Sequence, residues 1–154
     1  MEKLVSILKK DYPGLVFTAG TVAHWSPSLR QVTFMPDPTP AAIWALLHEL
    51  GHALLDHTSY ESDVSLLQKE AAAWEKAVEL GQQYGYPIDD NHIQSCLNTY
   101  RDWLHKRSTC PACGRHGVQP SQGRYICLNC QNTWKVTSAR FCRPYRLTEA
   151  LRQR

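Results

Sequence analysis

The chain has 154 residues, of which 43% are hydrophobic and 20% charged, a composition typical of folded proteins and not of disordered ones. No apolar run approaches the roughly 18 residues that a membrane span needs. The first eleven residues lack the apolar core and the cleavage site of a secretion signal, which predicts a cytoplasmic protein without membrane association. In that reducing compartment, paired cysteines are expected to hold metal rather than to form disulfides.

The net charge of +3 hides a difference between the two parts of the chain. Residues 1–100 contain 6 lysines and arginines against 12 acidic residues, which gives −6. Residues 101–154 contain 11 lysines and arginines against 2 acidic residues, which gives +9. This asymmetry predicts two functional parts, the second suited to an acidic partner; alternatively, the two parts attract each other.

Periodicity and residue preference predict a chain of mixed secondary structure. Apolar spacing predicts helices over Met1–Lys10, Ala41–Asp56, Ser62–Gln83 and Asn91–Lys106. Residues that favour extended structure predict strands at Leu15–Thr18, Gln31–Phe34, Arg124–Ile126 and Thr133–Val136. We expect the first two strands to form a small antiparallel sheet. Its Gln31–Phe34 strand is a core strand or, alternatively, the edge to which an extended peptide pairs.

These elements predict an α+β fold in three parts. Residues 1–106 form the first domain, whose central helix over Ala41–Asp56 is apolar nearly all round and is therefore expected in the middle of the domain. Residues 107–142 form a small second module, and residues 143–154 form a basic tail.

The central helix contains two histidines and a glutamate, in the order His48-Glu49-Leu50-Gly51-His52. Residues four apart on a helix share a face, so both imidazoles can reach one ion. Neutral imidazoles are good zinc ligands. Glu49 can touch a water on that zinc, accept its proton and so activate it for attack on a carbonyl carbon. The alternative is that both histidines are core residues bonded to carbonyl oxygens.

A catalytic zinc site needs a third protein ligand and an open position. Glu70 is the preferred candidate, because it lies in the apolar stripe of the second helix, where a carboxylate calls for a cation. Alternatively, Glu70 pairs with a lysine or an arginine. Glu61 and Asp63 are rival ligands, but both fall at the start of a helix, where capping explains them more simply.

Peptide hydrolysis also needs a donor for the oxyanion that develops in the transition state. His57 and Tyr60 follow the central helix and are the candidates for this role. Alternatively, both are ordinary surface residues.

Two motifs follow each other in the first domain: His48-Glu-Leu-Gly-His52-Ala-Leu-Leu-Asp-His57 and Lys69-Glu70-Ala-Ala-Ala-Trp74. With them the chain resembles, over roughly residues 15–85, the ImmA/IrrE-type metallopeptidases. It implies a minimal gluzincin-like domain, in which a short antiparallel sheet accompanies an HExxH helix and a second helix that donates the third ligand. It also implies zinc on His48, His52 and Glu70, with Glu49 as the base, and a regulatory protein as the substrate. The helix-turn-helix segment of some family members is absent.

Four cysteines form two CxxC pairs, Cys110-Pro-Ala-Cys113 and Cys127-Leu-Asn-Cys130, with 13 residues between them. Four thiolates complete a closed tetrahedron around zinc without an open position, which predicts a structural zinc ribbon. A module this short rarely has enough core to fold alone, so metal binding supplies folding free energy. The chain is therefore expected to hold two Zn²⁺ ions, one catalytic and one structural.

The function of the ribbon has two interpretations. Its basic residues and the aromatic residues between them could contact nucleic acid or another acidic partner. The candidate contact residues are Arg124, Lys135, Arg140 and Arg143. Alternatively, the aromatic residues Tyr125 and Trp134 fill a small core.

Together these patterns predict a zinc-dependent endopeptidase that acts on a protein or peptide substrate and whose ribbon recruits that substrate. A second interpretation is similarity to the SprT-like proteases, which act on DNA-bound proteins; those use a third histidine, and the acid at position 70 argues against them. A third is a non-enzymatic zinc-ribbon module that binds nucleic acid or protein. Glu49 distinguishes the peptidase from the non-enzymatic module, since a scaffold does not need a carboxylate beside a zinc-bound water.

Overall fold

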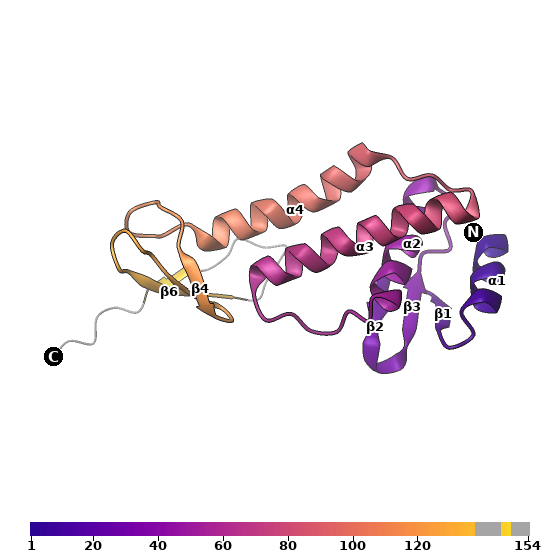
Figure 1. Cartoon of the computed structure of the whole chain (residues 1–154), viewed down its shortest axis with the longest axis horizontal. Helices are drawn as coiled ribbons and strands as arrows, with labels where there is room; N and C mark the ends of the chain where they lie inside the picture. The colour runs from indigo at the N-terminus through magenta and orange to yellow at the C-terminus, as the bar shows by residue number, and fades with distance from the viewer. Residues whose placement is uncertain (138–145, 149–154) are drawn as a thin grey trace. The chain divides into compact units, whose positions relative to one another are not determined.

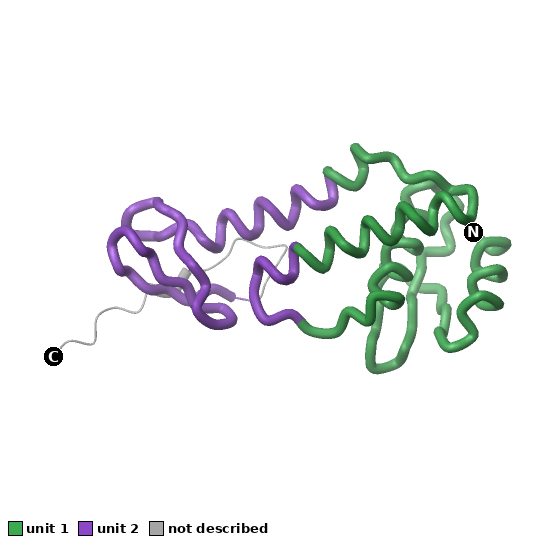
Figure 2. The backbone as a smooth tube through the Cα atoms, in the orientation of Figure 1, with its two compact units in different colours: residues 1–59, 68–94 green, residues 60–67, 95–154 purple. Residues whose placement is uncertain are grey.

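The computed structural model describes residues 1–137 and 146–148 and divides the chain into two compact units (Figure 2). The first unit comprises residues 1–59 and 68–94, and the second comprises residues 60–67 together with the described residues from 95 onward. Four α-helices and seven β-strands form over the described residues (Figure 1), which confirms the α+β class. Two helices, α3 (Asp63–Tyr84) and α4 (Asp90–Ser108), contribute residues to both units.

The first unit contains a three-stranded sheet in the order β1-β3-β2. Strand β3 (Gln31–Phe34) pairs with β1 (Val16–Ala19) in parallel and with β2 (His24–Ser26) in an antiparallel manner. The two strands predicted from the sequence, β1 and β3, were expected to be antiparallel; they are parallel, so this prediction is wrong. A short 3₁₀ turn over Pro27–Leu29 folds the unpredicted strand β2 back onto β3, so only the opposite edge of β3 is left for β1.

The central position of β3 confirms its interpretation as a core strand. Val32, Thr33 and Phe34 are buried, and both edges of the strand are paired. An extended peptide therefore cannot pair with β3, and the alternative interpretation of this strand as a peptide-binding edge is wrong. Helix α1 (Glu2–Asp11) adds Leu4 and Leu8 to the buried residues of this unit.

Helix α2 (Pro40–Leu54) begins one residue before and ends two residues before the predicted range of Ala41–Asp56, with Thr39 at the N-cap and proline in the first turn. Its buried side chains lie on several faces, as expected for a helix covered on more than one side. They belong to Ala42, Ile43, Leu46, Leu47, His48 and Leu50. The helix contacts both β2 and β3, so the sheet supports the segment that carries the paired histidines.

Gly51 allows α2 and α3 to approach each other at backbone distance. A Cβ atom on Gly51 would lie 2.6 Å from the carbonyl oxygen of Ala73, closer than Cβ atoms come to other atoms in real proteins. Ala73 is itself fully buried, so the two helices are in contact at this point. Because Ala73 lies one helical turn after Glu70, this contact brings the Glu70 carboxylate toward the histidines of α2.

The second unit contains an antiparallel sheet in the order β4-β5-β6-β7. Its strands are β4 (Val118–Ser121), β5 (Arg124–Ile126), β6 (Thr133–Val136) and β7 (Arg146–Thr148). Strands β5 and β6 have the predicted bounds, whereas β4 was not predicted. Tyr125 and Trp134 are cross-strand partners whose rings stack at 5.5 Å in the core of this unit, beside two buried cysteines.

Within residues 1–137 and 146–148, no helix combines the length and hydropathy that crossing a bilayer would require. The predicted basic tail at 143–154 lies outside the described residues, apart from the backbone of β7.

Candidate functional site: two clusters of metal-ligating residues

Three side chains of the first unit converge on one point. His48 Nε2 lies 3.1 Å from His52 Nε2 and 3.2 Å from Glu70 Oε2, and His52 Nε2 lies 3.7 Å from the same carboxylate oxygen. The two histidines are one helical turn apart on α2, and the carboxylate comes from α3. Each residue therefore offers one ligand atom to a common position, and the group could hold a metal ion.

The surroundings keep Glu70 ionised. Burial alone would raise the pKa of its carboxyl, but hydrogen bonds with His48 and then His52 outweigh burial and hold this pKa well below its ordinary value. Only 6% of Glu70 is exposed, and the described residues place no lysine or arginine within ion-pair distance of it. Glu70 therefore pairs with the two histidines, and the alternative that it pairs with a lysine or an arginine is wrong for the described residues.

His48 is held by an aromatic neighbour. Its ring stacks on the indole of Trp74 with centroids 4.2 Å apart, and its Nδ1 atom is buried without a hydrogen-bond partner among the described residues. Stacking against Trp74 fixes the plane of this imidazole, so its Nε2 atom faces the other two ligand atoms. The aromatic residue after Glu70 therefore shapes the site directly.

His57 lies against His52 on a different edge of that ring. The Nδ1 atoms of the two imidazoles are 2.9 Å apart, whereas His52 Nε2 faces His48 and Glu70. Partial burial, and then the charge on His52, lower the pKa of His57 below its ordinary value. The contact with His52 was not foreseen from the sequence, which offered His57 only as an oxyanion donor or a surface residue.

The remaining predicted residues near the site fall in different places. Glu49 is half-buried on α2, next to His48. Tyr60 is half-buried and belongs to the second unit. Of the rival ligands, Glu61 is exposed, and Asp63 is buried in the second unit with partners of its own.

Asp63 is the centre of a buried polar network, so the prediction that it caps a helix is incomplete. Its carboxylate accepts hydrogen bonds from Arg107 Nε at 2.5 Å, from Tyr125 Oη at 2.6 Å and from Gln119 Nε2 at 3.2 Å. Arg107 also donates to the carbonyl oxygen of Thr137, and its guanidinium lies 4.4 Å above the ring of Trp103. The network ties the first residue of α3 to the end of α4 and to β4 and β5.

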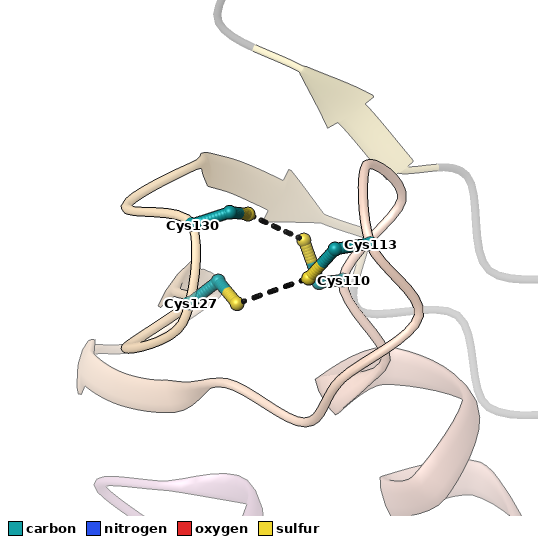
Figure 3. A group of neighbouring side chains, drawn as sticks. All are labelled: Cys110, Cys113, Cys127 and Cys130. Atoms are coloured by element: carbon teal, nitrogen blue, oxygen red, sulfur yellow. Dashed lines mark hydrogen bonds between the residues drawn. The ribbon is translucent and has the colours of Figure 1, made fainter.

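The four cysteines form a second cluster (Figure 3). Cys110 Sγ lies 3.6 Å from Cys130 Sγ, and Cys113 Sγ lies 3.5 Å from Cys127 Sγ. Cys110 and Cys127 are buried, whereas Cys113 and Cys130 are exposed. All four sulfur atoms point toward a common centre, so this group could also hold a metal ion.

The two CxxC turns repeat one hydrogen-bond pattern. The residue four positions after the first cysteine of each turn donates its N–H to that cysteine's carbonyl oxygen, Gly114 to Cys110 at 3.0 Å and Gln131 to Cys127 at 2.9 Å. Both donors have positive φ, 72° and 60°. Glycine adopts this conformation freely, whereas residues with a side chain, such as Gln131, adopt it rarely.

Backbone amides prepare part of the cluster for the thiolate form. The N–H of Arg115 lowers the pKa of the Cys113 thiol to about 6. The N–H of Asn132 acts in the same direction on Cys130, but the neighbouring thiols outweigh it and raise the Cys130 pKa to about 12. A thiol that donates a hydrogen bond to a neighbouring sulfur keeps its proton, whereas the sulfur that accepts the bond loses its own more easily, which explains the opposite shifts. A bound metal ion would favour the thiolate form of all four residues.

The basic residues predicted to contact nucleic acid and the aromatic residues between them lie on opposite faces of the sheet. Arg124 and Lys135 are cross-strand partners and lie on the face opposite Tyr125 and Trp134. These two aromatic residues are 2% and 0% exposed, so they fill the core and cannot stack on bases. Arg140 and Arg143 lie outside the described residues.

No family model, curated protein or solved structure matches this chain.

Proposed function

We propose that the chain is a zinc-dependent endopeptidase whose catalytic zinc is held by His48, His52 and Glu70. The convergence of their three ligand atoms carries this proposal. Zinc bonds of about 2.0–2.1 Å place two vertices of a tetrahedron about 3.3–3.4 Å apart. The three distances of 3.1, 3.2 and 3.7 Å fall around this value, so the residues fit a zinc ion without rearrangement of the helices.

The two clusters suit different tasks. Three protein ligands leave the fourth position of a tetrahedron open to substrate, whereas the four cysteines close theirs. Zinc–sulfur bonds of about 2.3 Å give edges of about 3.8 Å, and the measured sulfur–sulfur distances are 3.5 and 3.6 Å. We therefore assign the catalytic ion to the histidine and glutamate cluster and a structural ion to the ribbon.

The residues of the chain supply the proton transfers. A bound zinc ion would contribute Lewis acidity at the open position. Glu49 accepts a proton from the attacking water while the oxygen of that water bonds to the carbonyl carbon of the substrate. The same carboxyl returns that proton to the amide nitrogen as the carbon–nitrogen bond breaks. Water is consumed, and a carboxylic acid and an amine are formed, which exchange a proton and leave as a carboxylate and an ammonium group.

The resemblance to the ImmA/IrrE-type metallopeptidases supports the same assignment. It implies a gluzincin-like arrangement and a regulatory protein as the substrate. Because β3 is paired on both sides, the edge left for an extended peptide next to α2 is that of β2. We propose that the substrate pairs there. Similarity to the SprT-like proteases is less suitable, since their third histidine would stand where Glu70 supplies the ligand atom.

The non-enzymatic alternative is a zinc-ribbon module that binds nucleic acid or protein. Glu49 distinguishes it from the peptidase, because a scaffold needs no base beside the metal. We expect Glu49→Gln to keep metal content and folding but to abolish cleavage of a proteome-derived peptide library, read by mass spectrometry. Glu75→Gln changes an exposed glutamate of α3 and is the control. Cleavage by Glu49→Gln at the wild-type rate would remove Glu49 as the base, and no cleavage by the zinc-loaded wild type would favour the binding module.

Metal analysis tests the two sites separately. The wild-type chain should contain two zinc ions. His48→Ala or Glu70→Ala should remove one of them, and Cys110→Ser should remove the other. A second ion that survives both changes in the first cluster would refute the proposed catalytic site.

A further inference from the structure

The end of α2 turns His57 back toward His52. Asp56 adopts a left-handed conformation with φ of 51°, its N–H donates to the carbonyl oxygen of Ala53, and the N–H of His57 donates to that of His52. These are the two hydrogen bonds of the Schellman motif, which usually has glycine in the left-handed position. A non-glycine residue there is strained, so the surrounding structure must hold the turn.

Strand β2 provides part of that support. The indole N–H of Trp25 donates to the carbonyl oxygen of His57 at 2.9 Å. Trp25 pairs with Val32 of β3, a fully buried residue. His57 is therefore tied at its backbone to both the helix end and the sheet, which leaves its ring to face His52.

The hydrogen bond between the rings of His52 and His57 needs one proton, and metal binding by His52 determines which of the two nitrogens carries it. His52 Nε2 faces the other ligand atoms and must offer a lone pair to a metal ion. A neutral His52 then carries its proton on Nδ1, and His57 Nδ1, 2.9 Å away, accepts it. The neutral His57 in turn carries its own proton on Nε2. The hydrogen bond thus selects one tautomer for each imidazole.

His48 has no equivalent partner. Its Nδ1 atom is buried without a hydrogen bond among the described residues, and its ring is oriented by the stack on Trp74. The two metal-ligating histidines are therefore oriented in different ways, one by an aromatic face and one by a hydrogen bond. Ligating histidines commonly donate their second ring nitrogen to an acceptor, and His57 supplies that acceptor for His52.

We propose that His57 is a positioning residue that holds His52 in the tautomer and orientation needed for metal binding. The inference rests on the metal site of the proposed function and not on peptide hydrolysis. It replaces the two roles that the sequence offered for His57, since the ring acts through His52 and not on a substrate oxyanion. The Asp56 turn is the device that brings the acceptor into place.

Zinc affinity measured by chelator competition on the full chain tests the inference. His57→Phe keeps a ring but removes the acceptor, and it should weaken zinc binding at the first cluster by about 10–100-fold. His57→Asn places an amide oxygen near the lost nitrogen and should restore most of the affinity. His24→Phe changes an exposed histidine of β2 and should leave zinc affinity unchanged. The ribbon site serves as the internal reference in every variant.

Nitrogen NMR of the histidine side chains adds a reading that a purely structural role would not move. In the zinc-loaded wild type, Nδ1 of His52 should be protonated and bonded, and in His57→Phe that proton should exchange rapidly with water. Retention of wild-type affinity by His57→Phe, or equal losses in the Phe and Asn variants, would overturn the positioning role. If His48→Ala also leaves zinc content unchanged, the metal site itself is refuted, so the two failures are distinguishable.

Discussion

Replacement of Asp63 by alanine should destabilise the second unit strongly, because it leaves a buried guanidinium without its counter-charge. The side chains of Asp63 and Arg107 are 1% and 4% exposed, and two hydrogen bonds join them, at 2.5 and 3.2 Å. Tyr125 and Gln119 would also lose their acceptor. Removal of one partner from such a buried pair typically costs about 3–5 kcal/mol.

The short distance between the two charged groups does not by itself account for this cost in stability. Lys76 and Glu79 approach to 2.6 Å on α3, almost as closely, but their side chains are 35% and 66% exposed. An exposed pair contributes about 0–1 kcal/mol, since water already solvates both charges. Glu79→Ala is therefore the matched control, and the difference between the two variants measures the effect of burial.

Native-state amide hydrogen exchange of the zinc-loaded chain reads each variant in its own unit. Amides of β5 and β6 report on Asp63→Ala in the second unit, and amides of α3 within residues 68–84 report on Glu79→Ala in the first. A loss of about 3–5 kcal/mol should accelerate the slowest exchanging amides by roughly two to three and a half orders of magnitude. Asp63→Asn keeps the side-chain volume, so a comparable loss there identifies the missing charge as the cause. Arg107→Met in the Asp63→Asn background should recover most of it. An effect of Asp63→Ala no larger than that of Glu79→Ala would refute the reasoning.

Two further changes test the helix contact and the buried tyrosine. Gly51→Ala should cost about 1–3 kcal/mol and weaken zinc binding at the first cluster, since its Cβ would push Ala73 and α3 away. Gly14→Ala is the control: a Cβ there would meet only the Arg30 side chain, at an ordinary contact distance of 3.9 Å, so both the melting temperature and zinc affinity should stay unchanged. Burial and the hydrogen bond to Asp63 raise the pKa of Tyr125. Stability of the second unit is therefore full below about pH 10, the unfolded value, and falls as pH rises above it. Tyr125→Phe should flatten that fall in urea midpoints measured from pH 8 to 11, and an unchanged slope would contradict it.

Both ligand sets could be predicted because their spacing is local. Two histidines four apart share a helix face, and two cysteines three apart share a turn, whatever surrounds them. Glu70 needed one further step, the recognition that its position falls in the apolar stripe of its helix. The structure brings it to 3.2 Å from His48, and the glycine at position 51 is what lets the two helices meet.

The sheet of the first unit could not be predicted in the same way. Only three residues form β2, and they are too few to show an alternating pattern. Without that strand, two extended runs separated by a turn are expected to be antiparallel, as in a hairpin. The intervening strand reverses the chain once more, so β1 and β3 run in the same direction.

Asp63 shows why a local explanation can conceal a long-range one. A carboxylate in the first turn of a helix is accounted for by the helix dipole, so nothing in the local pattern pointed to a distant partner. Its partners lie 44, 56 and 62 positions away, and no periodicity relates them. Burial separates the two explanations: a capping carboxylate keeps its solvation, whereas one that is 1% exposed needs a cation and several donors. A cation from the end of α4 meets that need, so hydrogen bonds and opposite charges hold the start of α3 to α4 and to the sheet of the ribbon.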